Sequence, residues 1–158
     1  MRSCGRLTQL NTGSTTSVLQ SFDLGLAGAY VFYPAVTMNS AGDAYFVFSE
    51  SSASLYASAA TAAQRLGSPD GTLSGSGVIA QGLGIYNDCG SNCIVNGRNE
   101  NRWGDYSAAA VDPVNPSYVW VTGEYAASAS DPFDWGTEAA EVTLPQLTPR
   151  IFIPFVSK

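Results

Sequence analysis

Apolar runs separated by short turns recur along the chain, and two run-turn-run segments are copies of one pattern. Residues 33–50 and 106–123 lie 73 positions apart, and each reads as strand, tight turn, strand. In the first copy the turn contains Asn39 and Gly42, residue types that tight turns favour. A repeat of this length predicts a supersecondary unit that must stack on neighbouring units to bury its apolar face.

Extending the 73-residue register predicts about ten strands, arranged as half a unit followed by two whole units. The expected strands are 6–10, 17–22, 33–38, 44–49, 55–62, 77–81, 106–111, 118–122, 138–144 and 150–155. The second strand of each whole unit, 45–48 and 118–121, is apolar on both faces. Such a strand is expected to lie between two neighbouring sheets.

Four-stranded antiparallel units with small residues on the inner strand are typical of β-propeller blades. We therefore expect an all-β single domain of about two and a half blades: a half blade 4–28, a blade 30–85 and a blade 101–158.

Several motifs of the second unit carry a family resemblance: 101–107, 110–113, 119–121, 123–125 and 135–137. Over roughly residues 30–144 the chain resembles the closing blades of sialidase-like β-propellers from secreted bacterial proteins. The ending 149–156 is also similar to the C-termini of some exported bacterial proteins. The resemblance implies a secreted parent protein, of which this chain is the C-terminal part.

Too few units are present to close a ring, because a member of that family has about six or more blades. The open stack would expose two broad apolar sheet faces. We therefore expect a homo-oligomer, a dimer or trimer closed head to tail, with a compact monomer as the alternative.

An antiparallel unit brings the start of its first strand and the end of its second strand to one edge. In the second unit this edge carries Arg102 and Asp105 before the first strand, and Glu124 at the end of the second. Carboxyl groups suit general acid or base chemistry, and a guanidinium suits an anionic group. Asp105, Glu124 and Arg102 are therefore the catalytic candidates if the chain is an enzyme.

Aromatic residues are expected at the same edge, where they can stack on a sugar or another flat apolar ring. The candidate ligand-binding residues are Trp103, Tyr125 and Trp135, together with Glu50 at the equivalent place in the first unit. The alternative is structural: Trp103 covers the blade edge, Asp105 accepts backbone hydrogen bonds within its loop, and Glu50 has no ligand role.

Sialidases proper hold the substrate carboxylate with several arginines and pair a tyrosine nucleophile with a glutamate. Glu124 and Tyr125 are adjacent in a strand, so their side chains are expected on opposite faces, which disfavours such a pair. The turn 68–72 lies where the resemblance places an Asp-box, but it is one residue short and lacks the tryptophan.

Composition excludes several classes of function. The net charge is −6 and the chain has no histidine. A negative chain is a poor partner for nucleic acid, no apolar run approaches the length of a membrane span, and Ser/His/Asp or Cys/His catalysis is excluded. The expected function is binding of a glycan or other small ligand by a self-associating propeller. The alternatives are a glycosidase- or esterase-like hydrolase, and a truncated piece whose main property is self-association.

Cysteine and aspartate residues leave two further questions open. Cys89 and Cys93 flank a glycine-containing loop and either form a disulfide or remain two unlinked thiols. A cofactor is not expected, although calcium could bind the oxygens of four aspartates, Asp105, Asp112, Asp131 and Asp134. For Asp112, which precedes a proline, the alternative role is that of a turn former.

Overall fold

The computed structural model describes residues 2–88, 94–95, 98–99, 101–144 and 150–155, and its only regular elements are β-strands. The strands are β1 (Gly5–Asn11), β2 (Ser17–Leu24), β3 (Tyr30–Met38), β4 (Ala44–Ser52), β5 (Leu55–Gln64), β6 (Gly75–Ala80), β7 (Ile94–Val95), β8 (Arg98–Asn99), β9 (Ala108–Val111), β10 (Val119–Ala126), β11 (Trp135–Val142) and β12 (Arg150–Phe155). The all-β prediction is confirmed. No helix in the described part of the chain is long and apolar enough to cross a membrane.

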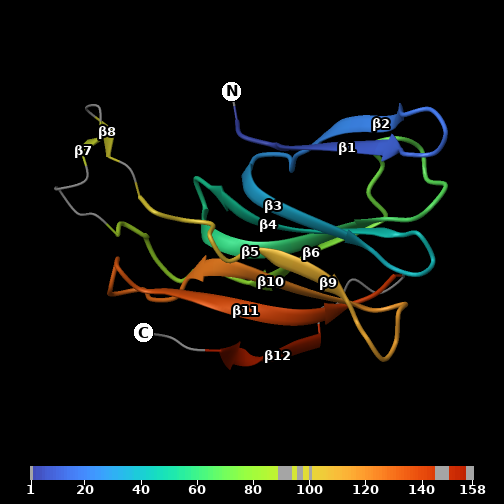
Figure 1. Cartoon of the computed structure of the whole chain (residues 1–158). Helices are drawn as coiled ribbons and strands as arrows, with labels where there is room; N and C mark the ends of the chain where they lie inside the picture. The colour runs from blue at the N-terminus through green and yellow to red at the C-terminus, as the bar shows by residue number, and fades with distance from the viewer. Residues whose placement is uncertain (1, 89–93, 96–97, 100, 145–149, 156–158) are drawn as a thin grey trace.

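The strands form separate antiparallel sheets that lie in layers (Figure 1). The first sheet is the pair β1-β2, the middle sheet has the order β3-β4-β5-β6, and the C-terminal sheet has the order β12-β11-β10-β9. Strands β7 and β8 form a small separate pair. In both four-stranded sheets consecutive strands are neighbours. These three sheets match the predicted half unit and two whole units.

The hairpin turns of the two whole units are built alike. The side-chain oxygen of Asn39 accepts the backbone N–H groups two and four residues later, at 3.0 and 2.9 Å. Asp112 stands 73 positions later and accepts the N–H groups two and three residues later, both at 2.7 Å. Gly42 completes the first turn with φ = 84°. Asp112 is therefore a turn former, because its carboxylate replaces backbone hydrogen bonds that the turn leaves unmade.

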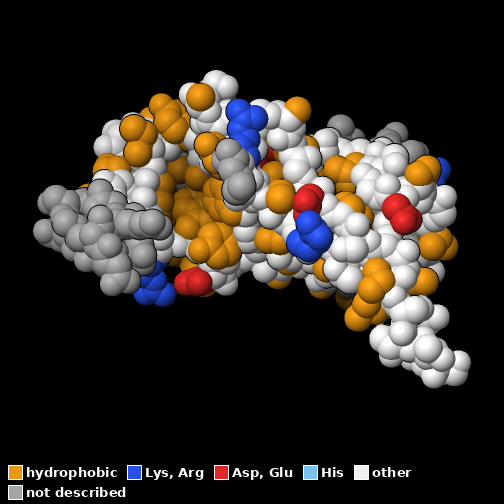
Figure 2. Space-filling model, turned by 90° about the horizontal axis from the view of Figure 1, so that it is seen from above, with side chains coloured by type: hydrophobic (Ala, Val, Ile, Leu, Met, Phe, Trp, Pro, Cys, Tyr) orange, Lys and Arg blue, Asp and Glu red, His pale blue; other side chains and the backbone are white. Residues whose placement is uncertain are grey.

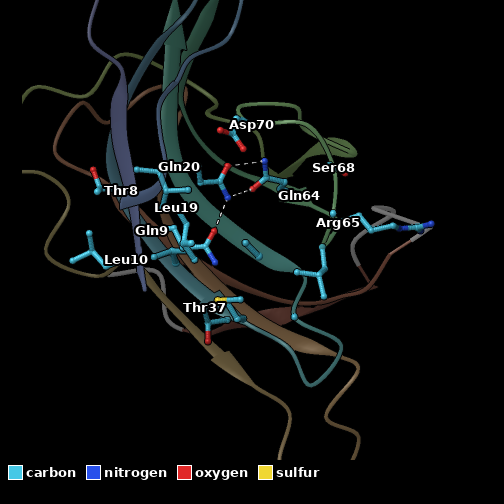
Figure 3. Close-up of a pocket in the computed structure, with 17 residues that line it drawn as sticks. Thr8, Gln9, Leu10, Leu19, Gln20, Thr37, Gln64, Arg65, Ser68 and Asp70 are labelled. Atoms are coloured by element: carbon cyan, nitrogen blue, oxygen red, sulfur yellow. Dashed lines mark hydrogen bonds between the residues drawn. The ribbon is translucent and has the colours of Figure 1, made fainter. Parts of the chain in front are cut away.

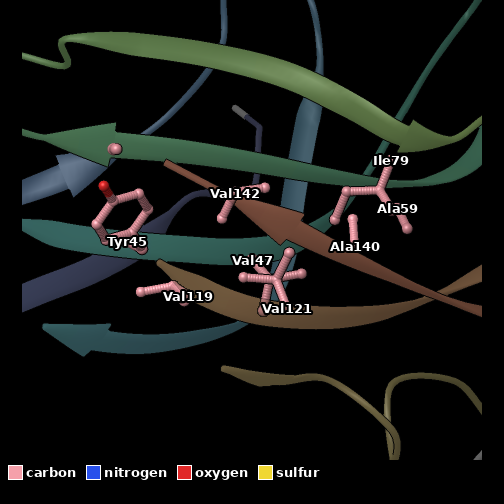
Figure 4. Packing of buried hydrophobic residues seen from close by; sticks show 9 residues of the cluster. Tyr45, Val47, Ala59, Ile79, Val119, Val121, Ala140 and Val142 are labelled. Carbon is pink, nitrogen blue, oxygen red and sulfur yellow. The ribbon is translucent and has the colours of Figure 1, made fainter. Parts of the chain in front are cut away.

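Two apolar cores lie between the layers, one on each side of the middle sheet. Tyr45 and Val47 of β4 face the C-terminal sheet, where they meet buried residues of β10 and β11 (Figure 4). Phe46 and Phe48 of β4 face the first sheet and pack with Leu24 and its neighbours. All four β4 side chains are at most 2% exposed. This confirms that residues 45–48 lie between two sheets.

Strand β10 is buried on one face and partly covered on the other. Val119 and Val121 are at most 1% exposed and pack against the middle sheet. Trp120 points to the opposite face, is half-buried, and donates its indole N–H to the Asp112 carboxylate at 2.6 Å. The prediction of complete burial is therefore correct for β4 and only half correct for β10.

Close contacts fix the C-terminal sheet on the middle sheet. A Cβ added to Gly123 of β10 would lie 2.9 Å from the Cβ of Ala59, so only glycine permits this approach. At the other end of the strands, the hydroxyl oxygen of Tyr45 accepts the N–H of Leu144 at 2.9 Å. The end of β10, where the candidate residues lie, is therefore held in a defined position over the middle sheet.

Candidate functional site

The acidic aromatic cleft is a depression of about 180 Å³ at the end of β10. Its lining combines four aromatic rings, three carboxyl groups and one guanidinium: Tyr86, Asp88, Arg102, Trp103, Asp105, Tyr106, Glu124 and Trp135. Three segments supply them. The chain after β6 provides the first two, the loop before β9 provides the next four, and the facing strands β10 and β11 provide the last two.

The cleft brings together most of the residues predicted from the sequence. Arg102, Trp103 and Asp105 line it with Glu124 and Trp135. The antiparallel pairing of β9, β10 and β11 causes this, because it puts the start of β9, the end of β10 and the start of β11 at one edge of the C-terminal sheet.

Two predicted site residues lie elsewhere. Tyr125 is on the opposite face of β10 from Glu124, as strand alternation predicts, and burial, followed by the negative charges of Glu138 and Asp134, raises its pKa. Glu50 pairs with Val31 on the face of β4 that meets the first sheet, and it is 6% exposed. The prediction that these two residues share a ligand face with Trp103 is therefore not matched by their positions.

The loop that carries Trp103 is fixed from three sides. The indole N–H of Trp103 donates to the hydroxyl oxygen of Ser49 on β4 at 2.9 Å. Gly104 donates its backbone N–H to Oε2 of Glu124 at 2.8 Å. Gly104 has φ = 90°, and an added Cβ would lie 2.1 Å from Cγ of Tyr33. The loop is thus wedged between the Tyr33 ring and the Glu124 carboxyl, and only glycine fits there.

The structural alternative for this loop holds for one of its two residues. Trp103 does brace the loop, through Ser49, although its ring still lines the cleft. Asp105 accepts no backbone hydrogen bond from any described residue. Its Oδ2 instead lies 3.3 Å from the Arg102 guanidinium, and both side chains are exposed. An ion pair this exposed contributes little to stability, so both groups stay available to a ligand.

Burial and nearby negative charges raise the pKa values of two groups in the cleft, Glu124 and Tyr86. Glu124 is 3% exposed, and burial is the main cause that raises its pKa. The charges of Asp105 and Asp88 raise it further, and the Gly104 hydrogen bond opposes the change. Burial, Asp88 and Glu124 raise the pKa of Tyr86 to about 12. Glu124 is therefore an acid that keeps its proton above the usual pH range of a carboxyl group.

Two aromatic pairs line the cleft together with the carboxyl groups. The rings of Tyr106 and Trp135 are stacked, with centroids 5.1 Å apart and an interplanar angle of 9°. Tyr86 and Trp103 meet edge to face, with centroids 4.8 Å apart and an angle of 70°. Such pairs hold each other's orientation and present preformed apolar surfaces beside polar groups. This combination suits a ligand with both apolar faces and hydroxyl or amino groups.

An apolar hollow of about 340 Å³ adjoins the cleft and shares the rings of Tyr86 and Trp103 with it. Phe32, Leu55 and Ile85 are among its other lining residues. Figure 2 shows that apolar side chains gather in a hollow on the upper face, where charged side chains are few. The site therefore has an acidic end and an apolar end.

Sequence reasoning missed three lining residues. Tyr86 and Asp88 lie between the two whole units, where the repeat gives no register. Tyr106 could have been found, because it aligns with Tyr33 in the repeat and directly follows Asp105. A buried acid was also missed: Glu138 on β11 is 5% exposed, and its Oε1 has no hydrogen-bond partner within the described part of the chain.

Two of the four proposed calcium ligands, Asp112 and Asp131, accept backbone hydrogen bonds in turns. No group of three or more metal-ligating side chains occurs among the residues that the structure describes. Asp112 binds backbone N–H groups, and Asp131 accepts the N–H of Phe133 at 2.9 Å. Cys89 and Cys93 lie outside the described residues, and Cys4 is a free, exposed cysteine.

Comparisons with known proteins identify no relative of this chain. No protein-family model matches the chain, and no significant match was found among curated proteins or solved structures. The resemblance to sialidase-like propellers therefore has no support from these comparisons.

Proposed function

We propose that the chain is a carbohydrate-binding module that holds a sugar in the acidic aromatic cleft. The observation that carries the proposal is that two aromatic pairs line one cleft together with a buried carboxyl group, Glu124. Aromatic faces cover the C–H faces of a sugar ring, while the carboxyl and guanidinium groups bind its hydroxyl groups.

The charge of the cleft favours neutral or amino sugars over sialic acids. Three carboxyl groups line it, against the single guanidinium of Arg102. A further carboxylate brought by the ligand would be repelled by these groups. An ammonium group would instead bind near Asp88 and Asp105 and would also lower the pKa of Glu124.

The proposed architecture is a segment of a β-propeller. Support comes from the equivalent faces that the two whole units present to the sheet before them. Phe46 and Phe48 of the middle sheet pack against the first sheet. Val119 and Val121 of the C-terminal sheet, 73 positions later, pack against the middle sheet. Repeats stacked in one direction lead to a ring or an open array.

The proposed self-association is a head-to-tail contact between the outer faces of the first and C-terminal sheets. The outer face of the first sheet is polar: Arg6 pairs with Asp23, and the Thr8 and Ser21 hydroxyls lie 3.2 Å apart. A contact through this face is polar, and a dimer or trimer closed by it would form only at high protein concentration.

A hydrolase is the second candidate, on the specific observation that the pKa of buried Glu124 is raised. Glu124 would act as general acid, and the exposed Asp105 as the second carboxylate. Release of product from aryl glycosides or esters, lost in Glu124→Gln, would identify a hydrolase. Binding without product would favour the binding module.

Calorimetric titration tests the binding proposal with oligosaccharides of glucosamine, of glucose and of sialyllactose type. We expect glucosamine oligosaccharides to bind most tightly, and Trp135→Ala to weaken them about tenfold. Trp120→Phe is the matched control, because Trp120 lies outside the cleft. No binding of any sugar, or equal loss in both variants, would disprove the assignment.

A further inference from the structure

A second and larger cavity lies between the first and middle sheets, on the turn side of the strands, and shares no residue with the acidic aromatic cleft. Its volume is about 520 Å³, within the range of small-molecule sites, roughly 300–1,000 Å³. Residues of both sheets line it. The larger apolar residues among them are Leu7, Leu10, Leu19, Val36, Met38 and Leu66.

Three glutamine side chains form a hydrogen-bonded chain across this apolar cavity (Figure 3). The Gln20 amide donates to Oε1 of Gln9 at 2.7 Å and to Oε1 of Gln64 at 2.9 Å. Gln64 donates back to Oε1 of Gln20 at 3.2 Å and to the Pro69 carbonyl at 3.4 Å. Gln64 is 4% exposed, so this row of hydrogen-bonded glutamines begins in the protein interior and ends at Gln9.

The donor count leaves one amide available to a ligand. Each glutamine side chain has two N–H donors. Both donors of Gln20 and both of Gln64 are used within the chain, whereas those of Gln9 have no acceptor among the described residues. In Figure 3 the Gln9 amide lies between Gln20 and Thr37, inside the cavity. A half-buried donor pair between apolar walls gains most from a carbonyl acceptor.

The charges around the cavity select against an anionic ligand. Arg65 is among the lining residues, but its side chain points away from the glutamines in Figure 3. The other nearby cation, Arg6, is paired with Asp23 on the outer face of the first sheet. A carboxylate would therefore lose its hydration without a compensating cation.

We propose that this cavity binds a small, uncharged amphipathic molecule whose carbonyl oxygen accepts hydrogen bonds from Gln9. Its alkyl part lies along Val36, Met38 and Leu19, side chains that are otherwise about half exposed to water. Covering them supplies the hydrophobic part of the affinity, and the glutamine chain orients the polar end. This site is independent of the sugar site.

The test uses ¹H–¹⁵N spectra of the protein titrated with heptan-2-one, and with hexanoate as the charged analogue. We expect the ketone to shift the side-chain NH₂ signals of Gln9 and to bind more tightly than hexanoate. Gln9→Leu should weaken the ketone about fivefold to tenfold, the worth of one net hydrogen bond. Gln81→Leu is the matched control, because Gln81 is exposed and outside the cavity.

A second variant, Val36→Arg, places a charge on the half-exposed apolar wall and should abolish ketone binding without unfolding the chain. Three results would overturn the proposal: no shift of the Gln9 amide at millimolar ketone, equal affinity in Gln9→Leu, or hexanoate binding as tightly as the ketone. Shifts of cavity signals on dilution without ligand would also overturn it, since they would show that a second copy of the chain fills the cavity.

Discussion

Replacing Gly104 by alanine should reveal how firmly the cleft loop is wedged in place. An alanine with φ = 90° is strained by about 1–2 kcal/mol, because L-residues rarely adopt left-handed backbone angles. The new methyl would also lie 2.1 Å from Cγ of Tyr33, so the ring or the loop must move. A loop that moves breaks the hydrogen bond to buried Glu124, and leaving that buried polar group without its partner costs about 1–3 kcal/mol. Together these predict that unfolding becomes easier by about 2–5 kcal/mol.

Urea unfolding with Gly67→Ala as the matched control separates the two contributions. Gly67 has φ = 79° and nothing within 4 Å of an added Cβ, so its substitution brings only the backbone strain. We expect Gly104→Ala to be less stable than Gly67→Ala by at least about 1 kcal/mol, the contribution of the lost hydrogen bond alone. Equal losses in the two variants would refute the wedging of the loop between Tyr33 and Glu124.

Three further substitutions test the acid and the core. The raised pKa of Glu124 means that the folded chain binds its proton more tightly, so this contribution to stability is lost as pH rises from 4.5, its ordinary pKa, through the raised value. In Glu124→Gln, the unfolding free energy measured with urea should fall less between pH 4 and 7. An unchanged fall would show that Glu124 is not its source. Tyr45→Phe leaves the Leu144 N–H without its acceptor and should lower the unfolding free energy by about 1–3 kcal/mol, whereas an unchanged value would argue against that bond. Val121→Ala should cost about 2 kcal/mol in thermal unfolding and Val114→Ala almost nothing, because Val121 is 1% and Val114 90% exposed; similar values would contradict the core.

The strands and their grouping could be predicted because local signals were strong. Turn residues such as Asn39 and Asp112 occupy equal places in the two whole units, and the apolar runs beside them recur at the same spacing. Strand ends were less predictable, because neighbours extend them. Strand β10 continues to Ala126 since β11 pairs along its whole length, and β9 begins only at Ala108.

The site was predictable only where the repeat fixed a register. Asp105 and Glu124 meet because antiparallel pairing brings strand ends together. Tyr86 is brought to the cleft by a tertiary contact that the repeat does not predict. Leu83 donates its N–H to the Ala126 carbonyl at 2.8 Å, which places the following residues beside the end of β10. Glu50 is missing from the cleft because its side chain is on the face of β4 toward the first sheet.

The indole N–H signals give the most direct test that the acidic aromatic cleft binds a sugar. The chain has three tryptophans, two in the cleft and one, Trp120, outside it. In a ¹H–¹⁵N titration with glucosamine oligosaccharides, the signals of Trp103 and Trp135 should shift together and saturate, and that of Trp120 should stay in place. No shift, or a shift of Trp120 alone, would contradict the proposed function.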